Sequence, residues 1–299
     1  MTKLEEIVLI SLKLQSLNEL TSLNRKEAQE RLDSITPQAM ELLTSKDVVS
    51  HMQNAYSLTV PEYLANPHNQ YIIDELIEFM GLLPEGAFVL DLGCGPGRDT
   101  IFMSCKNNDF RLSQMKGETN GKKTADKYSI PQNALRVAGL DQSPEMITKA
   151  ELAVQFLENS GKQFVYKPIF SVGDMHNFSS LNMITYKPLF SGIWSCAALF
   201  THTPLELLDV ALHSVSSSIS QDGIFFVSYT NGQATGIYDK LLLSSTGIIK
   251  YFSQPNPKQI TDIAERYNLY LEKEKFNDFE VNGVIKKKNL FVSQFFRKK

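Results

Sequence analysis

The sequence predicts an α/β protein with a doubly wound, mostly parallel sheet, and three observations support that prediction. Short apolar segments alternate with amphipathic helical patterns between residues 88 and 229. The first apolar segment runs into a glycine-rich turn at 93–97. Two later segments are followed directly by helix-start signals at Ser143 and Thr203. Strands that alternate with helices in this way form parallel sheets that are covered on both faces.

The individual elements follow in chain order. Strands are expected at 88–90, 136–140, within 163–172, at 190–198 and at 223–229, with helices at 97–105, 144–158 and 204–219 between them. Ser143 before Pro144 is an N-cap signal, and Thr203-Pro204-Leu205-Glu206 is typical of a capping box with proline at the first helical position. Beyond them, a helix is expected at 257–267 and strands at 270–276 and 290–296, with Asn282-Gly283 as a turn.

Residues 1–80 are expected to form a helical extension ahead of a domain at 81–299. Apolar residues on one stripe predict a single amphipathic helix over 4–20. Thr36-Pro37 predicts the start of a second helix, 54–68 is expected to be irregular, and 72–80 is expected to be helical. Residues 106–133 are polar and contain few apolar side chains, which is typical of a long surface insertion.

Composition excludes several classes of function. The formal net charge of −3 gives no basic footprint for nucleic acid. The three cysteines have no CxxC spacing and the five histidines are scattered, so neither a disulfide framework nor a metal site is expected. The apolar run near the amino terminus is too short to span a membrane. We therefore expect a cytoplasmic protein without a metal, a membrane or a nucleic-acid partner.

The strongest chemical signal is Val89-Leu90-Asp91-Leu92-Gly93-Cys94-Gly95-Pro96-Gly97-Arg98-Asp99. An apolar strand ends in an acidic residue and then enters alternating glycines before a helix. Glycine is needed where the backbone turns tightly or where a ligand lies against it. A dinucleotide site would place a pyrophosphate at this turn, but the charge of Asp91 disfavours an anion there and favours a cationic ligand.

At this point the sequence resembles the class I S-adenosylmethionine (SAM)-dependent methyltransferases, and the resemblance covers about residues 85–299. Their glycine-rich first motif is similar to 91–97, the acidic end of their second strand to Gly139-Leu140-Asp141-Gln142-Ser143, their adenine turn to Gly173-Asp174-Met175, and their fourth strand to 194–202. The resemblance implies a Rossmann-like sheet whose last two strands form an antiparallel hairpin at the edge. Within the family, small-molecule enzymes of bacterial type are the most similar.

The resemblance also implies the cofactor and its site. SAM is expected at Asp91, Gly93, Cys94, Gly95, Asp141, Gln142, Asp174, Met175 and Cys196. Asp141 would accept hydrogen bonds from the ribose hydroxyls, or else serve as a helix-capping aspartate. Asp174 would accept from the adenine amine, or else be an ordinary turn aspartate. Two departures stand out: Gly93 and Asp141 are unusually far apart because of the insertion, and Ser191 replaces an acidic residue that relatives often carry.

Methyl transfer from a sulfonium needs alignment and the exclusion of water more than a catalytic group. His202, in the loop after the fourth strand, is the candidate general base, or else a loop histidine that packs locally. Tyr56, Tyr63 and Tyr229 are the candidate contacts to a small-molecule acceptor. Glycines at 232, 236 and 247 predict a mobile cover over 229–253.

Two other functions remain open at the level of sequence. An NAD-dependent oxidoreductase shares the strand–glycine–helix pattern, but Asp91 and the absence of a Tyr-x-x-x-Lys pair after the fourth or fifth strand speak against it. A non-catalytic SAM-binding module is the second alternative, because a reaction that rests on alignment requires no catalytic residue. The acceptor, its reacting atom and the oligomeric state do not follow from the sequence.

Overall fold

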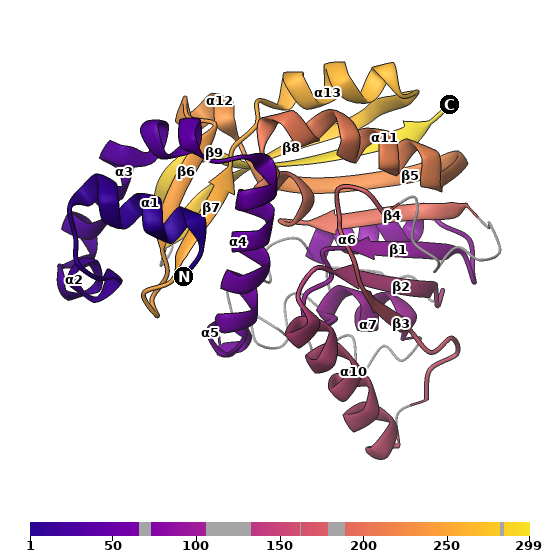
Figure 1. Ribbon diagram of the computed structural model, residues 1–299. Coiled ribbons are helices and arrows are strands. Elements are labelled where there is room, and N and C mark those ends of the chain that lie inside the picture. The colour runs from indigo at the N-terminus through magenta and orange to yellow at the C-terminus, as the bar shows by residue number, and fades with distance from the viewer. Residues whose placement is uncertain (66–72, 106–132, 162, 179–188, 282–283) are drawn as a thin grey trace.

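The computed structural model describes residues 1–65, 73–105, 133–161, 163–178, 189–281 and 284–299 (Figure 1). Nearly all of the predicted insertion at 106–133 and the predicted turn at Asn282-Gly283 lie outside the described residues, as does the side chain of Tyr63.

A seven-stranded sheet has the order β3-β2-β1-β4-β5-β9-β8. Its strands are β1 (Phe88–Leu92), β2 (Arg136–Asp141), β3 (Ile169–Val172), β4 (Phe190–Cys196), β5 (Ile219–Thr230), β8 (Leu269–Val281) and β9 (Val284–Lys298). The first five in this order pair in parallel, and β9 is antiparallel to both of its neighbours. The predicted fold class is confirmed, including the antiparallel hairpin at the sheet edge.

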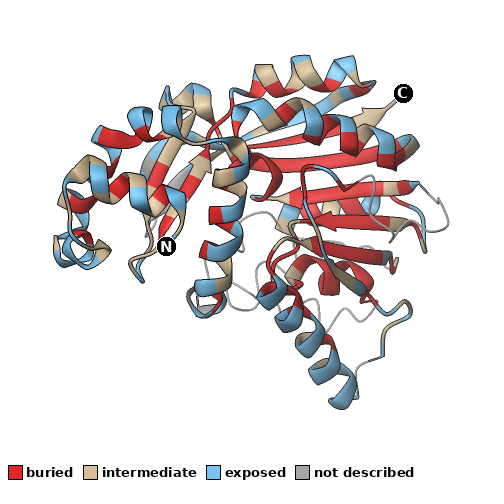
Figure 2. Cartoon of the chain, viewed as in Figure 1, coloured by how far each residue is buried: buried red, intermediate tan, exposed pale blue. Residues whose placement is uncertain are grey.

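Helices cover both faces of this sheet. They are α6 (Ile73–Gly81), α7 (Arg98–Ser104), α10 (Pro144–Asn159), α11 (Leu208–Ser218) and α13 (Pro257–Arg266). Successive residues of β1 point to opposite faces, so Val89 packs with α6 and α7 while Leu90 packs with α11 and α13. Figure 2 shows the strands between these layers as the most deeply buried part of the chain.

One predicted helix start is confirmed and one is wrong. Ser143 caps α10, because its Oγ accepts from the backbone N–H of Met146 at 3.2 Å and Pro144 is the first helical residue. Thr203 caps no helix. Its hydroxyl turns back to the carbonyl of Leu199, so a short 3₁₀ turn, η4 (Leu205–Leu207), precedes α11.

The amino-terminal region is more helical than the sequence predicts. It contains α1 (Lys3–Leu12), α2 (Leu17–Ser22), α3 (Arg25–Leu42), α4 (Ser45–Leu58) and α5 (Val60–Ala65). The single helix expected over 4–20 is interrupted at Lys13, which has a φ of 55°. The expected start at Thr36-Pro37 lies inside α3, which begins at an Asn24 cap instead. The region expected to be irregular contains the end of α4 and all of α5.

Residues 229–253 form structure of their own. After α12 (Gly232–Thr235), β6 (Asp239–Leu243) and β7 (Ile249–Ser253) make a separate two-stranded antiparallel sheet. Leu241, Ile249 and Tyr251 of this hairpin are buried in one apolar cluster with residues of α1, α3 and α4. Figure 1 shows the amino-terminal helices beside this hairpin, at one end of the large sheet. The extension and the hairpin are therefore packed as one unit.

Candidate functional site

The candidate site lies at the carboxyl ends of β1, β2 and β4. β1 pairs with β2 on one side and with β4 on the other, so the connections after β1 and β4 leave toward opposite halves of the sheet. Ligands of open α/β sheets bind at this kind of switch in strand order, where diverging connections leave a crevice.

The glycine turn after β1 has a backbone that other residues would strain. Gly93, Gly95 and Gly97 have φ values of 77°, 53° and 83°, in the left-handed region. A Cβ placed on Gly93 would lie only 2.3 Å from the Cβ of Ala198, in the loop after β4. The backbone N–H groups of Gly93 and Cys94 both donate to the carbonyl of Leu140. The ends of β1, β2 and β4 therefore meet at this turn.

Asp141 ties the end of β2 to the glycine turn. One carboxylate oxygen accepts from the N–H of Gly95 and the other from the N–H of Ser143, each at 2.9 Å. Burial raises the pKa of Asp141, while these backbone hydrogen bonds act in the opposite direction. A carboxylate has about four acceptor positions, so Asp141 can accept further hydrogen bonds from a ligand. Beside it, the buried Oε1 of Gln142 has no hydrogen-bond partner among the described atoms.

Two buried acidic residues lie beneath this turn. Asp91 accepts from the hydroxyl of Thr100 at 2.5 Å. Asp99 accepts from the guanidinium of Arg98 at 2.6 Å and from the indole N–H of Trp194 at 2.9 Å. Burial, together with the charge of Asp99, raises the pKa of Asp91 to about 8.

Sequence reasoning assigned no role to Arg98, Asp99 or Thr100, although the quoted motif runs through the first two. The feature that could have identified these three residues is their position in the first turn of α7, directly after the glycines. Cys196 lies beside this group, with its Sγ 3.8 Å from a guanidinium nitrogen of Arg98. Burial raises the pKa of the Cys196 thiol to about 12, so the thiol keeps its proton at pH 7.

The turn after β3 contains Asp174 and Met175. Asp174 is half exposed and accepts from both the backbone N–H and the ring Nδ1 of His176, each at 2.8 Å. Burial opposes ionisation, but the hydrogen bonds from His176 outweigh it and lower the pKa of Asp174. Met175 is buried, and its Sδ would lie 3.9 Å from a Cβ on Gly93. This turn therefore also borders the glycine turn.

His202 is buried and both of its ring nitrogens have partners. Nδ1 lies 2.8 Å from the carbonyl oxygen of Tyr251, and Nε2 lies 2.5 Å from the hydroxyl of Tyr56. Burial lowers the pKa of His202 to about 4, so its ring is neutral at pH 7. The structure therefore brings two of the predicted site residues, His202 and Tyr56, into hydrogen-bond contact.

α4 crosses the carboxyl end of β1. Its residue Ser57 contacts the hydroxyl of Ser143, after β2, at 3.1 Å, while the preceding Tyr56 contacts His202, after β4. Because β1 lies between β2 and β4 in the sheet, the two contacts place α4 across the glycine turn.

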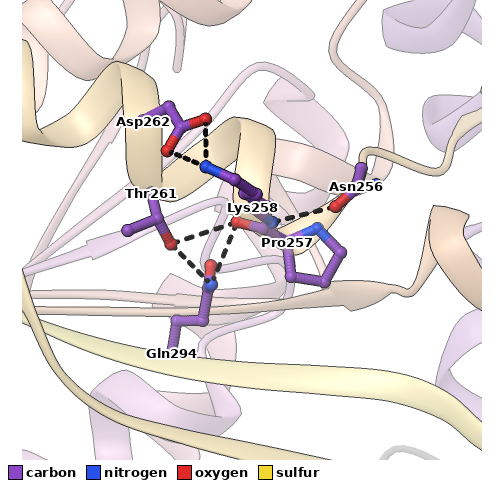
Figure 3. Close-up of polar contacts among 6 residues, drawn as sticks. All are labelled: Asn256, Pro257, Lys258, Thr261, Asp262 and Gln294. Atoms are coloured by element: carbon purple, nitrogen blue, oxygen red, sulfur yellow. Dashed lines mark hydrogen bonds and ion pairs between the residues drawn. The ribbon is translucent and has the colours of Figure 1, made fainter.

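Tyr229, the third tyrosine expected to contact the acceptor, lies in the core. Its hydroxyl donates to Gln294 of β9 at 2.6 Å. Gln294 in turn donates to the carbonyl of Pro257 and to Thr261, and so holds the first turn of α13 (Figure 3). We leave Tyr229 out of the site, because its ring is buried and its hydroxyl has a structural partner.

A shallow surface hollow of about 670 Å³ lies on α13 and does not belong to this site. It is lined by Asn256, Lys258, Gln259, Asp262, Ile263 and Arg266. These residues come from one helix and its cap, and Lys258 and Asp262 pair with each other (Figure 3). We assign no function to it.

The described part of the chain holds no group of three or more side chains that could bind a metal ion. None of its helices is long and apolar enough to cross a membrane.

Comparison with known proteins places the fold. No protein-family model matches the chain, and no curated protein matches its sequence. A SAM-dependent methyltransferase from Methanosarcina mazei is 15% identical, with 73% of this chain and 95% of that chain covered and a TM-score of 0.52. The 1,6-didemethyltoxoflavin-N1-methyltransferase of Burkholderia thailandensis is 13% identical, with 86% and 91% covered and a TM-score of 0.54. The chain therefore has the Rossmann-like fold of class I SAM-dependent methyltransferases.

Proposed function

We propose that the protein is a SAM-dependent methyltransferase that acts on a small-molecule acceptor. The observation that carries the proposal is the meeting of the glycine turn, Asp141 and the turn of Asp174 at the switch in strand order, under a helix of the extension. The Burkholderia enzyme of the same fold was solved with bound 1,6-didemethyltoxoflavin and S-adenosylhomocysteine, which supports this ligand class.

The residues of the site fit SAM in charge and in hydrogen-bonding capacity. The free acceptor positions of Asp141 suit the two ribose hydroxyls, and the unpartnered Oε1 of Gln142 suits a further donor. Asp174, half exposed and ionised, suits the adenine amine, with Met175 against the ring. Beneath the glycine turn, ionisation of the buried Asp91 would be favoured by a cationic ligand and opposed by the pyrophosphate of NAD, while Asp99 is paired with Arg98.

Bound SAM supplies an electrophilic methyl group on a sulfonium, whose leaving group is neutral. The chain has to orient the acceptor and keep water away. α4 and the β6–β7 hairpin are placed to do both, because they cover the carboxyl ends of the strands from one side. We also propose a cytoplasmic setting, because all three cysteines are free thiols.

Calorimetric titration tests the proposal. We expect S-adenosylhomocysteine to bind and NAD not to bind. Asp141→Ala should weaken binding by about 1–3 kcal/mol, because donors of the ribose lose a charged acceptor. Asp262→Asn, on the far helix α13, is the matched control and should bind as the wild type does. Unchanged affinity in Asp141→Ala would show that the ribose assignment is wrong, and binding of NAD alone would favour the oxidoreductase.

A further inference from the structure

His176 is a buried histidine whose two ring nitrogens both have side-chain partners. It is 2% exposed, and its Nδ1 lies 2.8 Å from Oδ1 of Asp174 while its Nε2 lies 3.0 Å from the hydroxyl of Thr203. The ionised carboxylate of Asp174 can only accept, so Nδ1 of His176 carries a proton and donates it. The ring is therefore a donor toward the turn after β3, and the loop after β4 holds it from its other side.

Thr203 is itself fixed by contacts of its backbone and its side chain. Its N–H donates to the hydroxyl of Ser253 at 2.9 Å, and its carbonyl accepts from the hydroxyl of Tyr238 at 3.1 Å. Its own hydroxyl also contacts the carbonyl of Leu199, and the residue is fully buried. A side chain that is bound at both ends and buried loses its rotational freedom. The imidazole of His176 therefore has one orientation, which is set from outside the turn after β3.

This imidazole in turn holds the carboxylate of Asp174. Oδ1 accepts from the ring and from the backbone N–H of His176, each at 2.8 Å, and the backbone N–H of Asn177 also stabilises the charge. A carboxylate has about four acceptor positions, so Asp174 keeps at least one for a ligand. Its side chain is half exposed, so a ligand at the glycine turn can reach it.

On this geometry, and resting on the proposed function, we propose that His176 is a positioning residue that makes the cofactor site select an amino purine over an oxo purine. It directs the carboxylate of Asp174 and keeps it an acceptor. Such a carboxylate attracts the exocyclic amine of adenine, which donates, and repels the carbonyl oxygen of hypoxanthine, which only accepts. A carboxyl group that could rotate or take up a proton would adapt to either base and discriminate less.

Two substitutions can separate the roles of the two ring nitrogens. The amide nitrogen of asparagine takes up nearly the position of Nδ1, and that of glutamine nearly the position of Nε2. His176→Asn should therefore keep a donor to Asp174, whereas His176→Gln should keep the contact to Thr203 and lose that donor. Both variants remove the imidazole, so a difference between them reports on the hydrogen bond to Asp174 alone.

Calorimetric titration with S-adenosylhomocysteine and with its deaminated analogue S-inosylhomocysteine measures the selectivity. We expect the wild type and His176→Asn to prefer the adenosyl compound by about 10²-fold, and this preference should fall about tenfold in His176→Gln. A merely structural role would weaken both ligands alike and leave the ratio of their affinities unchanged. His213→Asn, at an exposed histidine of α11, is the control and should keep both affinities. An equal preference in the two His176 variants, or no preference in the wild type, overturns the inference.

Nitrogen NMR of histidine-labelled protein tests the direction of the hydrogen bond without any ligand. Nδ1 of His176 should be protonated at pH 7, and its signal should move in Asp174→Ala, a change at a half-exposed turn residue. This measurement decides the matter if the two His176 variants do not fold. An unprotonated Nδ1, or a signal that stays in place in Asp174→Ala, overturns the inference. Failure of the wild type to bind S-adenosylhomocysteine would instead overturn the proposed function.

Discussion

Asp91 is a buried carboxyl group. Among the described residues, no basic side chain donates a hydrogen bond to it. Its hydrogen bond comes from the hydroxyl of Thr100, whereas Arg98 pairs with Asp99. Burial and the neighbouring Asp99 therefore raise the pKa of Asp91 to about 8, and in the ligand-free protein the group is largely protonated at pH 7. A cationic ligand above the glycine turn would favour its ionised form.

The stability of the ligand-free protein should therefore fall as pH rises. A carboxyl whose pKa is higher in the folded than in the unfolded state stabilises the fold at low pH, and that contribution is lost as pH rises through about 8. The free energy of unfolding, measured in urea from pH 5 to pH 8, should drop by up to about 1.4 kcal/mol per pH unit and then level off above the folded-state pKa of about 8. Asp91→Asn should flatten this slope and Asp262→Asn should keep it. An equal slope in wild type and Asp91→Asn would contradict the assignment.

Single residues were predicted best where one backbone feature forces the residue type. The glycines after β1 and the cap at Ser143 stand where the sequence placed them, because positive φ and unpaired helix N–H groups select few residue types. Thr203 was predicted as a cap from the same kind of local pattern, but a tertiary contact decides its place: its N–H donates to Ser253, fifty residues away along the chain. The partner of His202 could not be predicted for the same reason, since Tyr56 comes from a different helix.

At the scale of elements, Gly93 of the glycine turn is closely packed by neighbouring atoms, whereas Gly236 after α12 is not. Gly93 and Gly236 have similar φ values of 77° and 69°, but a Cβ on Gly93 would overlap Ala198, whereas no atom of the described residues lies within 4 Å of one on Gly236. Gly236→Ala should lose only the left-handed conformational preference, about 1 kcal/mol. Gly93→Ala should lose more and also abolish binding of S-adenosylhomocysteine. Thermal melts measure the stability of the two variants, and titrations measure their binding of S-adenosylhomocysteine. An equal loss of stability in both variants would contradict this account.

The predicted insertion gives a second test at this scale. The chain on its two sides is in contact, because the backbone N–H of Leu135 donates to the carbonyl of Met103 at 3.1 Å. A short glycine–serine linker in place of 108–130 should therefore keep the fold, since the cost of closing a loop changes slowly with its length. Circular dichroism and melting of the shortened chain provide the measurement, and a large loss of stability would show that the segment packs as structure.

Periodicity predicted the strands and the larger helices of the sheet well, because a buried parallel strand is a short apolar run in any context. It failed in the amino-terminal helices. The apolar stripe over 4–20 continues through Lys13, although the chain turns there. Thr36-Pro37 was predicted as a helix start, but both residues lie inside α3. The hydroxyl of Thr36 donates to the carbonyl of Leu32 within the helix and so caps no helix start. Such details depend on what each helix packs against.

At the scale of the whole molecule, one histidine joins the extension to the hairpin, and a second joins the hairpin to the loop after β4. His51 of α4 donates to the carbonyl of Ile249, and His202 donates to that of Tyr251, so both bind one edge of β7. Tyr56 then connects α4 back to His202. The hairpin, the helix and the loop after β4 are thus held together by neutral imidazoles. Sequence reasoning could not foresee this unit, because its parts are about two hundred residues apart.

This arrangement should make the unit sensitive to acid. Burial lowers the pKa of His51 and lowers that of His202 to about 4, so each is held neutral when the unit is closed. In the open chain a histidine titrates near its ordinary pKa of 6.5, and the closed form therefore loses stability as pH falls from about 6.5 toward 4, by up to about 3 kcal/mol for His202. Amide hydrogen exchange, corrected for intrinsic rates, should accelerate in α4 and β7 at pH 5 relative to pH 7, while β1 stays protected.

His202→Gln, which cannot become charged, should reduce this acid response, and His213→Gln, at an exposed histidine on α11, should leave it intact. Equal acceleration in β1 would mean that the whole fold responds, and the histidines would not be the cause.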